Sequence, residues 1–228
     1  MNFNTNNPSK KISKLQATLT IVFVAALMVS NIISSRIFNF FGFNMTSAVF
    51  IFPITYVLSD VFSEVYGYAW SRRTCYTAFI VNLISLVIFT IVSYLPTGAN
   101  PYNAIVADSF RTVLTGSVAC SLASFIAFVV GDFVNDKIFA SFKKNHEGLT
   151  NHTGFGVRAL ISSFAGELVD SIIYLPLAFL VLNPIMTVKD VLIMIALQVV
   201  LKTGYEFCIL PVTTAITKKV SAYEEKVV

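Results

Sequence analysis

Residues 158–182 constrain the fold most, because they combine the length and apolarity of a transmembrane helix with two acidic side chains. About 20 helical residues, rising about 1.5 Å each, cross a hydrocarbon core of about 30 Å. Glu167 and Asp170 share one helical face, which Ser163 and Tyr174 extend by a turn on either side. An ionisable side chain at mid-bilayer costs on the order of 3 kcal/mol, so this face is expected to line a cavity or a bundle interior. Alternatively, the acids pair with bases on neighbouring helices and only hold the bundle together.

Composition places the whole chain in the membrane. Hydrophobic residues make up 56% of the 228 residues and charged residues only 12%, whereas a soluble domain carries roughly 25% charged residues. We therefore predict an all-α, polytopic membrane protein that forms a single integral membrane domain over residues 1–228, with polar cytoplasmic ends at 1–14 and 218–228. The six transmembrane helices are expected near residues 15–37, 46–61, 74–95, 113–133, 158–182 and 191–214.

The basic residues predict the orientation of these helices. Six spans place both termini on one side of the membrane, and most lysines and arginines fall on that side, with only Arg36, Arg111 and Lys189 opposite. Positive residues are enriched in cytoplasmic connections, so both the N-terminus and the C-terminus are predicted to be cytoplasmic. The net charge of +4 thus reports orientation, and no nucleic-acid partner is expected.

No motif indicates catalysis or a metal site. Three cysteines lie one each in separate apolar regions, and the two histidines lie in a polar loop without a metal-ligand spacing. The chain has no HExxH, no Gly-x-Ser-x-Gly and no phosphate-binding glycine-rich loop. We therefore expect no enzyme activity, no cofactor and no metal.

The last predicted span carries a second polar stripe. Gln198, Lys202 and Glu206 follow one another at four-residue spacing and so share a helical face. Lys202 is the one basic side chain placed deep in a span. It either contributes to a polar site bounded by the first, fifth and sixth spans, or serves as a structural counter-ion to Glu206 or to an acid of residues 158–182.

Two further polar groups fall in the first half of the chain. Asn31, in the first span, either packs against a neighbouring helix or lines a solute path. Asp60 and Glu64 share a face at the end of the second apolar run, where the alternative is an interfacial salt bridge with the arginines at 72–73. Pro53 interrupts that run and predicts either a kink or a freed backbone carbonyl inside the membrane.

The excess of acids over bases among the deep residues favours a cationic or donor-rich ligand. One carboxylate can accept both the N1–H and the amino group of a guanine-like base, and Lys202 can serve a ligand carbonyl. Tyr174 and neighbouring phenylalanines offer rings for stacking on a flat base.

Four segments resemble the bacterial queuosine precursor transporter family, whose older name is the vitamin uptake transporter family. The block DVFSEVYGYAWSRR at 60–73 is similar to the family's acidic and aromatic motif, and KTGYEFCILP at 202–211 is similar to its span-six segment. Asn31 in VSNIISSR matches an asparagine of the family's first span, although Arg36 stands where the family often has lysine. In RALISSFAGELVDSIIYLPLAF the matching positions are Arg158, Ser163, Glu167, Asp170 and Ser171.

This resemblance implies import of 7-cyano-7-deazaguanine and 7-aminomethyl-7-deazaguanine, precursors of the tRNA nucleoside queuosine, through the bacterial inner membrane. The partners are then a small-molecule base and the lipid bilayer, and formation of a homo-oligomer stays open. The alternative is a substrate-capture subunit of a multi-component importer for a purine-like or vitamin-like solute, because the chain carries no energy-coupling part of its own.

Overall fold

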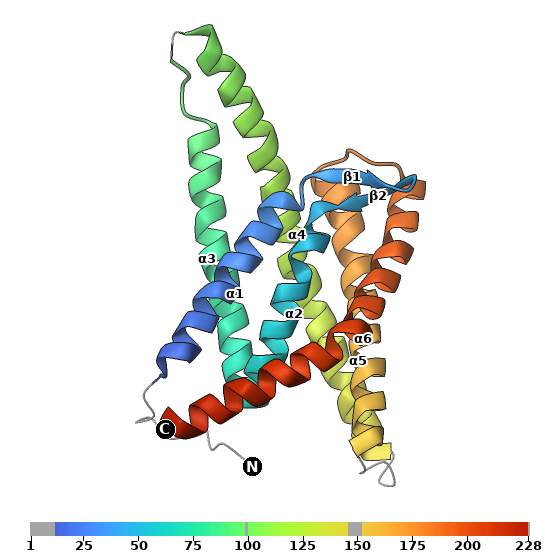
Figure 1. The fold of residues 1–228 in the computed structure, drawn as a ribbon. Helices are drawn as coiled ribbons and strands as arrows, with labels where there is room; N and C mark the ends of the chain where they lie inside the picture. Colours follow the sequence, from blue (N-terminus) through green and yellow to red (C-terminus); the bar gives the residue numbers. More distant parts are fainter. Residues whose placement is uncertain (1–11, 99, 146–151, 228) are drawn as a thin grey trace. The chain divides into compact units, whose positions relative to one another are not determined.

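The computed structural model describes residues 12–98, 100–145 and 152–227 (Figure 1). The helices are α1 (Lys14–Ile33), α2 (Phe52–Val61), α3 (Tyr68–Ser93), α4 (Pro101–Asn145), α5 (His152–Pro176) and α6 (Val188–Val227). The short elements are strands β1 (Ile37–Phe40) and β2 (Phe43–Thr46), the 3-10 helix η1 (Ser47–Phe50) and the π-helical segments η2 (Phe62–Tyr66) and η4 (Leu177–Leu182).

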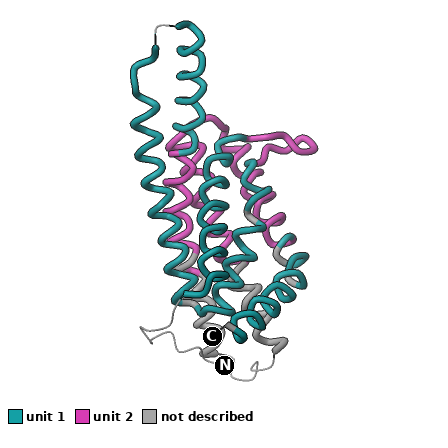
Figure 2. Tube along the Cα trace, turned by 60° about the vertical axis from the view of Figure 1, so that its left-hand side comes forward, with its two compact units in different colours: residues 1–36, 46–117, 205–228 teal, residues 37–45, 118–204 magenta. Residues whose placement is uncertain are grey.

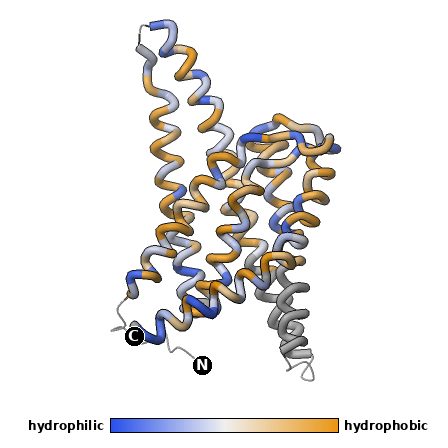
Figure 3. The backbone as a smooth tube through the Cα atoms, in the orientation of Figure 1, coloured by the Kyte–Doolittle hydropathy of each residue, from blue (hydrophilic) through white to orange (hydrophobic). Residues whose placement is uncertain are grey.

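Five helical stretches of this described part are long and apolar enough to cross a membrane. In each of them less than half of the most apolar window is buried, and many large apolar side chains are exposed. Figure 3 shows how hydrophobic residues predominate along α1 and α3. Such a surface is stable against lipid and not against water. The chain is therefore an all-α membrane protein. The five stretches are Lys14–Ser34, Ala69–Ser93, Pro101–Gly131, Phe164–Leu182 and Val188–Ile209.

The chain packs as two compact units, coloured separately in Figure 2. Unit 1 comprises residues 1–36, 46–117 and 205–228, and in it α1 packs against α2 and α3. Unit 2 comprises residues 37–45 and 118–204, and contains the second part of α4, α5, η4 and the first part of α6.

In unit 1, the run of η1, α2 and η2 extends alongside the full length of α1. At one end, the backbone N–H and the hydroxyl of Ser47 both donate to the carbonyl of Arg36 at 2.9 Å. At the other end, Ser13 and Tyr66 donate to the carboxylate of Glu224 at 2.5 and 2.8 Å. Ser13 is the N-cap of α1. The start of the run therefore lies beside the end of α1, and the end of the run lies beside the start of α1.

The structure corrects the expectation for Pro53 in the second apolar run and shows the form of the connection that precedes it. Pro53 neither kinks a helix nor frees a carbonyl in mid-span, because it lies in the first turn of α2, where a missing N–H costs nothing. The predicted connection at 39–43 is a β-hairpin closed by Phe41 and Gly42, both at positive φ. Positive φ at both central residues is what a tight two-residue hairpin turn requires, and Asn39 Oδ1 accepts from Gly42 N–H at 3.0 Å.

Helices also extend into regions predicted as connections or ends. The segment between the spans predicted at 74–95 and 113–133 is helical over most of its length, since α4 begins at Pro101. The connection expected at 138–157 is helical at both ends, because α4 runs to Asn145 and α5 begins at His152. Nor is 218–228 simply a polar end: α6 continues through Pro211 to Val227, and Val220 and Glu224 are buried.

Candidate functional site

A partly buried ion pair joins the two polar stripes of α5 and α6. The ammonium of Lys202 on α6 lies 3.0 Å from the Oδ2 atom of Asp170 on α5, with side-chain exposures of 7% and 27%. Both residues belong to membrane-length helical stretches. Asp170 lies about 18 Å along the helix from Leu182, where its stretch ends, and Lys202 lies about 21 Å from Val188, where the next stretch begins. The two side chains therefore meet at similar depth in adjacent antiparallel helices. The prediction that Lys202 lies near an acid of residues 158–182 is confirmed.

Close packing of α4 on α5 positions the acidic partner. A Cβ atom added at Gly131 would lie 3.0 Å from the carbonyl oxygen of Gly166 and 3.3 Å from the Cβ atom of Asp170. Only a hydrogen fits there without displacing α5, because a backbone carbonyl cannot rotate away as the end of a flexible side chain can. Gly131 lies near the end of the span predicted at 113–133, and the sequence alone predicted no role for it. The signal available in the sequence was the lack of a side chain, which allows close approach of another helix.

Further polar groups on the same helices are buried. Gln198 lies one turn before Lys202 on α6 and is 4% exposed. Within the described residues, the hydroxyls of Ser121, Ser171 and Thr203 are buried without a hydrogen-bond partner. Buried polar atoms of this kind are normally satisfied by ordered water or by a ligand. Unit 2 thus carries bonding capacity that its own side chains do not use.

Both acids of α5 contribute to this arrangement. Asp170 has the ammonium of Lys202 as a counter-charge at 3.0 Å. Glu167 lies one turn earlier on α5 and is half-buried. Because the positive charge is placed directly on Asp170, the arrangement presents a carboxylate and an ammonium together, with a second carboxylate a turn away.

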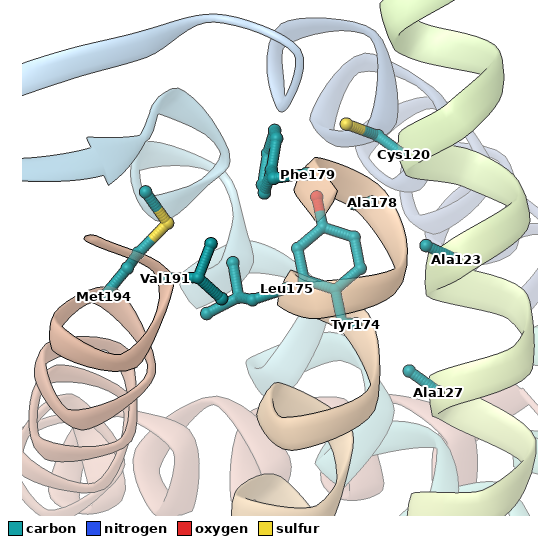
Figure 4. Close-up of a cluster of buried hydrophobic side chains, with 9 residues drawn as sticks. All are labelled: Cys120, Ala123, Ala127, Tyr174, Leu175, Ala178, Phe179, Val191 and Met194. Carbon is teal, nitrogen blue, oxygen red and sulfur yellow. The ribbon is translucent and has the colours of Figure 1, made fainter. Parts of the chain in front are cut away.

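Tyr174 lies in an apolar environment. Its ring packs edge-on against Phe179 at 6.2 Å within a buried cluster that also contains Ala123 and Ala127 of α4 (Figure 4). Only 5% of the residue is exposed, so its ring is a packing surface in this structure and stacking on a ligand would require the cluster to open. Its place in the ligand site stays a prediction.

Asn31 belongs to unit 1, whereas the ion pair belongs to unit 2. It is buried on α1 beside Ser30, and within the described chain its Nδ2 atom and the Ser30 hydroxyl have no hydrogen-bond partner. A shared site between Asn31 and the acids of α5 stays a prediction.

The structure says less about the other predicted site residues. Asp60 on α2 and Glu64 on the π-helical turn η2 are exposed residues of unit 1. Single π-helical turns occur often at functional sites. The side chains of Ser163 and Glu206 lie outside the described residues, so their predicted roles are untested.

Comparison with known proteins identifies the family. A family model described as "Putative vitamin uptake transporter" matches residues 46–216, about three quarters of the chain. The match includes both partners of the ion pair, Asp170 and Lys202. Neither a curated protein nor a solved structure matches the chain. The chain therefore belongs to the vitamin uptake transporter family.

Proposed function

We propose that this protein is a secondary transporter that imports the queuosine precursors 7-cyano-7-deazaguanine and 7-aminomethyl-7-deazaguanine across a bacterial inner membrane. The observation that carries the proposal is the ion pair of Asp170 and Lys202, which joins two membrane-length helical stretches and is partly buried. Intramembrane ionisable residues typically mark a solute path. Family membership supports transport of a small organic solute, and the motifs around Asp60 and Glu167 support the deazaguanine class.

The polar groups of unit 2 complement the edge of a guanine-like base. That edge carries two adjacent donors, N1–H and the 2-amino group, next to the acceptor O6. A carboxylate can accept both donors, and an ammonium beside it can donate to O6. Glu167 is the carboxylate proposed for the donors, and Lys202 the donor for O6. The charge of an aminomethyl substituent adds attraction to an acid-rich site.

We further propose six membrane crossings with both termini in the cytoplasm. The run of η1, α2 and η2 adds a crossing to the five long stretches, because it extends between the same two ends as α1. Six crossings also agree with the hydrogen bond from Ser13, at the start of α1, to Glu224, near the end of α6, since that bond keeps both chain ends on one side.

Uptake by vesicles that contain only this chain tests the proposed function. Accumulation of either labelled precursor supports a self-sufficient transporter. Binding without uptake, with uptake restored by added ATPase subunits, would instead identify a substrate-capture subunit. Exclusion of 7-deazaadenine is also expected, because it lacks the donor edge and would leave buried acids unpaired. Strong competition by 7-deazaadenine would contradict the guanine-specific site.

The pH dependence provides a second readout for the same site. Protonation of the site acids removes the negative charge that favours the aminomethyl cation. The affinity for the aminomethyl precursor relative to the cyano precursor should therefore fall as pH decreases. Competition between the two labelled precursors across pH measures this ratio, and a constant ratio would argue against an acidic site.

A further inference from the structure

A surface groove lies between the start of α1 and the end of α6, within unit 1. Its volume is about 460 Å³. The lining residues are Lys14, Leu15 and Thr18 from α1, and Lys219, Val220 and Tyr223 from α6. Neither helix forms the groove alone, because it exists only where the last turns of α6 pack beside the first turns of α1.

The groove combines positive charge with an apolar floor. Its lining has two lysines and no acid. The nearest acid along the chain, Glu224, is buried, does not line the groove and accepts hydrogen bonds from Ser13 and Tyr66. Leu15 and Val220 supply apolar surface to the same lining.

The position of the groove relative to the membrane identifies its occupant. Lys14 is the first residue of a membrane-length stretch, so the groove lies where a hydrocarbon core meets the headgroup layer. Lysine stems lie along apolar surface and place their charge at this level, and tyrosines are enriched there. A groove with both features matches a phospholipid, whose phosphate is anionic and whose glycerol and first methylenes are apolar.

We propose that this groove binds the headgroup of an anionic phospholipid, with Lys14 and Lys219 contacting the phosphate and Leu15 and Val220 contacting the adjoining glycerol and acyl carbons. Basic pockets between helices at a membrane surface are the kind of site that holds anionic headgroups. The bound lipid would bridge the first and last helices of the chain beside the hydrogen bond between Ser13 and Glu224. This site is separate from the ion pair of unit 2.

Native mass spectrometry of the detergent-purified full chain tests this inference. Phosphatidylglycerol is titrated against phosphatidylcholine, and bound lipid is counted for the natural protein, for Lys14→Gln/Lys219→Gln, and for the control Lys218→Gln/Lys226→Gln. Both double variants lose two positive charges, but Lys218 and Lys226 do not line the groove. Thermal unfolding of each variant in the same detergent reports whether the fold is retained, and the single variants replace the double variant if it unfolds.

We expect the natural protein to retain phosphatidylglycerol in preference to phosphatidylcholine. A lysine near a membrane surface contributes about 1 kcal/mol, so the affinity for phosphatidylglycerol should fall about fivefold in either single variant and about 25-fold in Lys14→Gln/Lys219→Gln. The control should change little. Equal losses in both double variants would show diffuse attraction to charge and overturn the proposal, as would equal retention of phosphatidylcholine. Inorganic phosphate is added as a competitor: displacement of the lipid at millimolar phosphate would assign the groove to free phosphate instead.

Discussion

Two acids stabilise this protein in different ways. Asp170, in unit 2, has a lysine ammonium at 3.0 Å within membrane-length helices. Glu224, in unit 1, is buried near the end of α6 and is held by two neutral hydroxyls, those of Ser13 and Tyr66. Among the described residues, one carboxylate thus has a lysine counter-charge and the other accepts hydrogen bonds from two hydroxyls.

The difference indicates what each site can do. A carboxylate and an ammonium that compensate each other can exchange that contact for a ligand with both donors and an acceptor, so the pair of Asp170 and Lys202 suits binding. The hydrogen bonds from two hydroxyls to Glu224 connect the last turns of α6 to α1 and to η2, as expected of a contact that stabilises the fold. Breaking the charged pair on one side strands a charge, whereas losing one hydroxyl leaves another donor in place.

The largest effect is expected for Lys202→Met. Removing the ammonium leaves Asp170 without its counter-charge, and breaking a buried pair on one side costs about 3 to 5 kcal/mol. Thermal unfolding in detergent should show the loss. The matched control is Lys202→Met/Asp170→Asn, which removes both charges and should recover much of the stability. A single variant as stable as the natural protein would show that the pair is not desolvated.

Glu167→Gln should weaken ligand binding by about 2 kcal/mol, because the substitution places an NH2 donor where the base needs an acceptor. Equilibrium binding of 7-cyano-7-deazaguanine measures the change. Glu225→Gln serves as the control, since this exposed glutamate lies near the chain end. Equal affinities for Glu167→Gln and the natural protein, with both folded, would remove Glu167 from the site.

Gly131→Ala tests whether close packing of α4 positions Asp170. The new methyl group would meet the Gly166 carbonyl at 3.0 Å and the Asp170 Cβ at 3.3 Å, so α5 must shift. Overpacking of this kind costs about 1.5 kcal/mol, and ligand affinity should fall with it because the acid moves. Gly204→Ala is the matched control, since nothing lies within 4 Å of a Cβ there. Similar behaviour of the two variants would contradict the positioning role.

Tyr66→Phe is expected to cost about 1 kcal/mol of folding stability, since it removes one hydrogen bond to Glu224 while Ser13 still donates. Chemical denaturation of both proteins in detergent measures the difference. A loss as large as that of Lys202→Met would mean that the hydroxyl contacts of Glu224 matter as much as the charged pair.

The sequence alone determined the class of the protein and part of its site. Length and apolarity predicted six spans, and five of them overlap membrane-length helical stretches of the structure, because spanning a bilayer requires about 20 apolar residues whatever they contact. The helical spacing of Glu167 and Asp170 placed them on one face, since that relation depends only on local geometry. The rarity of a deep lysine indicated that Lys202 needed an acidic partner.

Only the tertiary structure decided which groups meet. The choice of Asp170 as the partner of Lys202 depends on the depth at which α5 and α6 pass each other, and that depth depends on packing such as the contact of Gly131 with α5. The bond between Ser13 and Glu224 joins residues 211 positions apart, which no local pattern encodes. Local periodicity fixes which side chains share a helical face, whereas contacts between helices depend on how distant surfaces fit together.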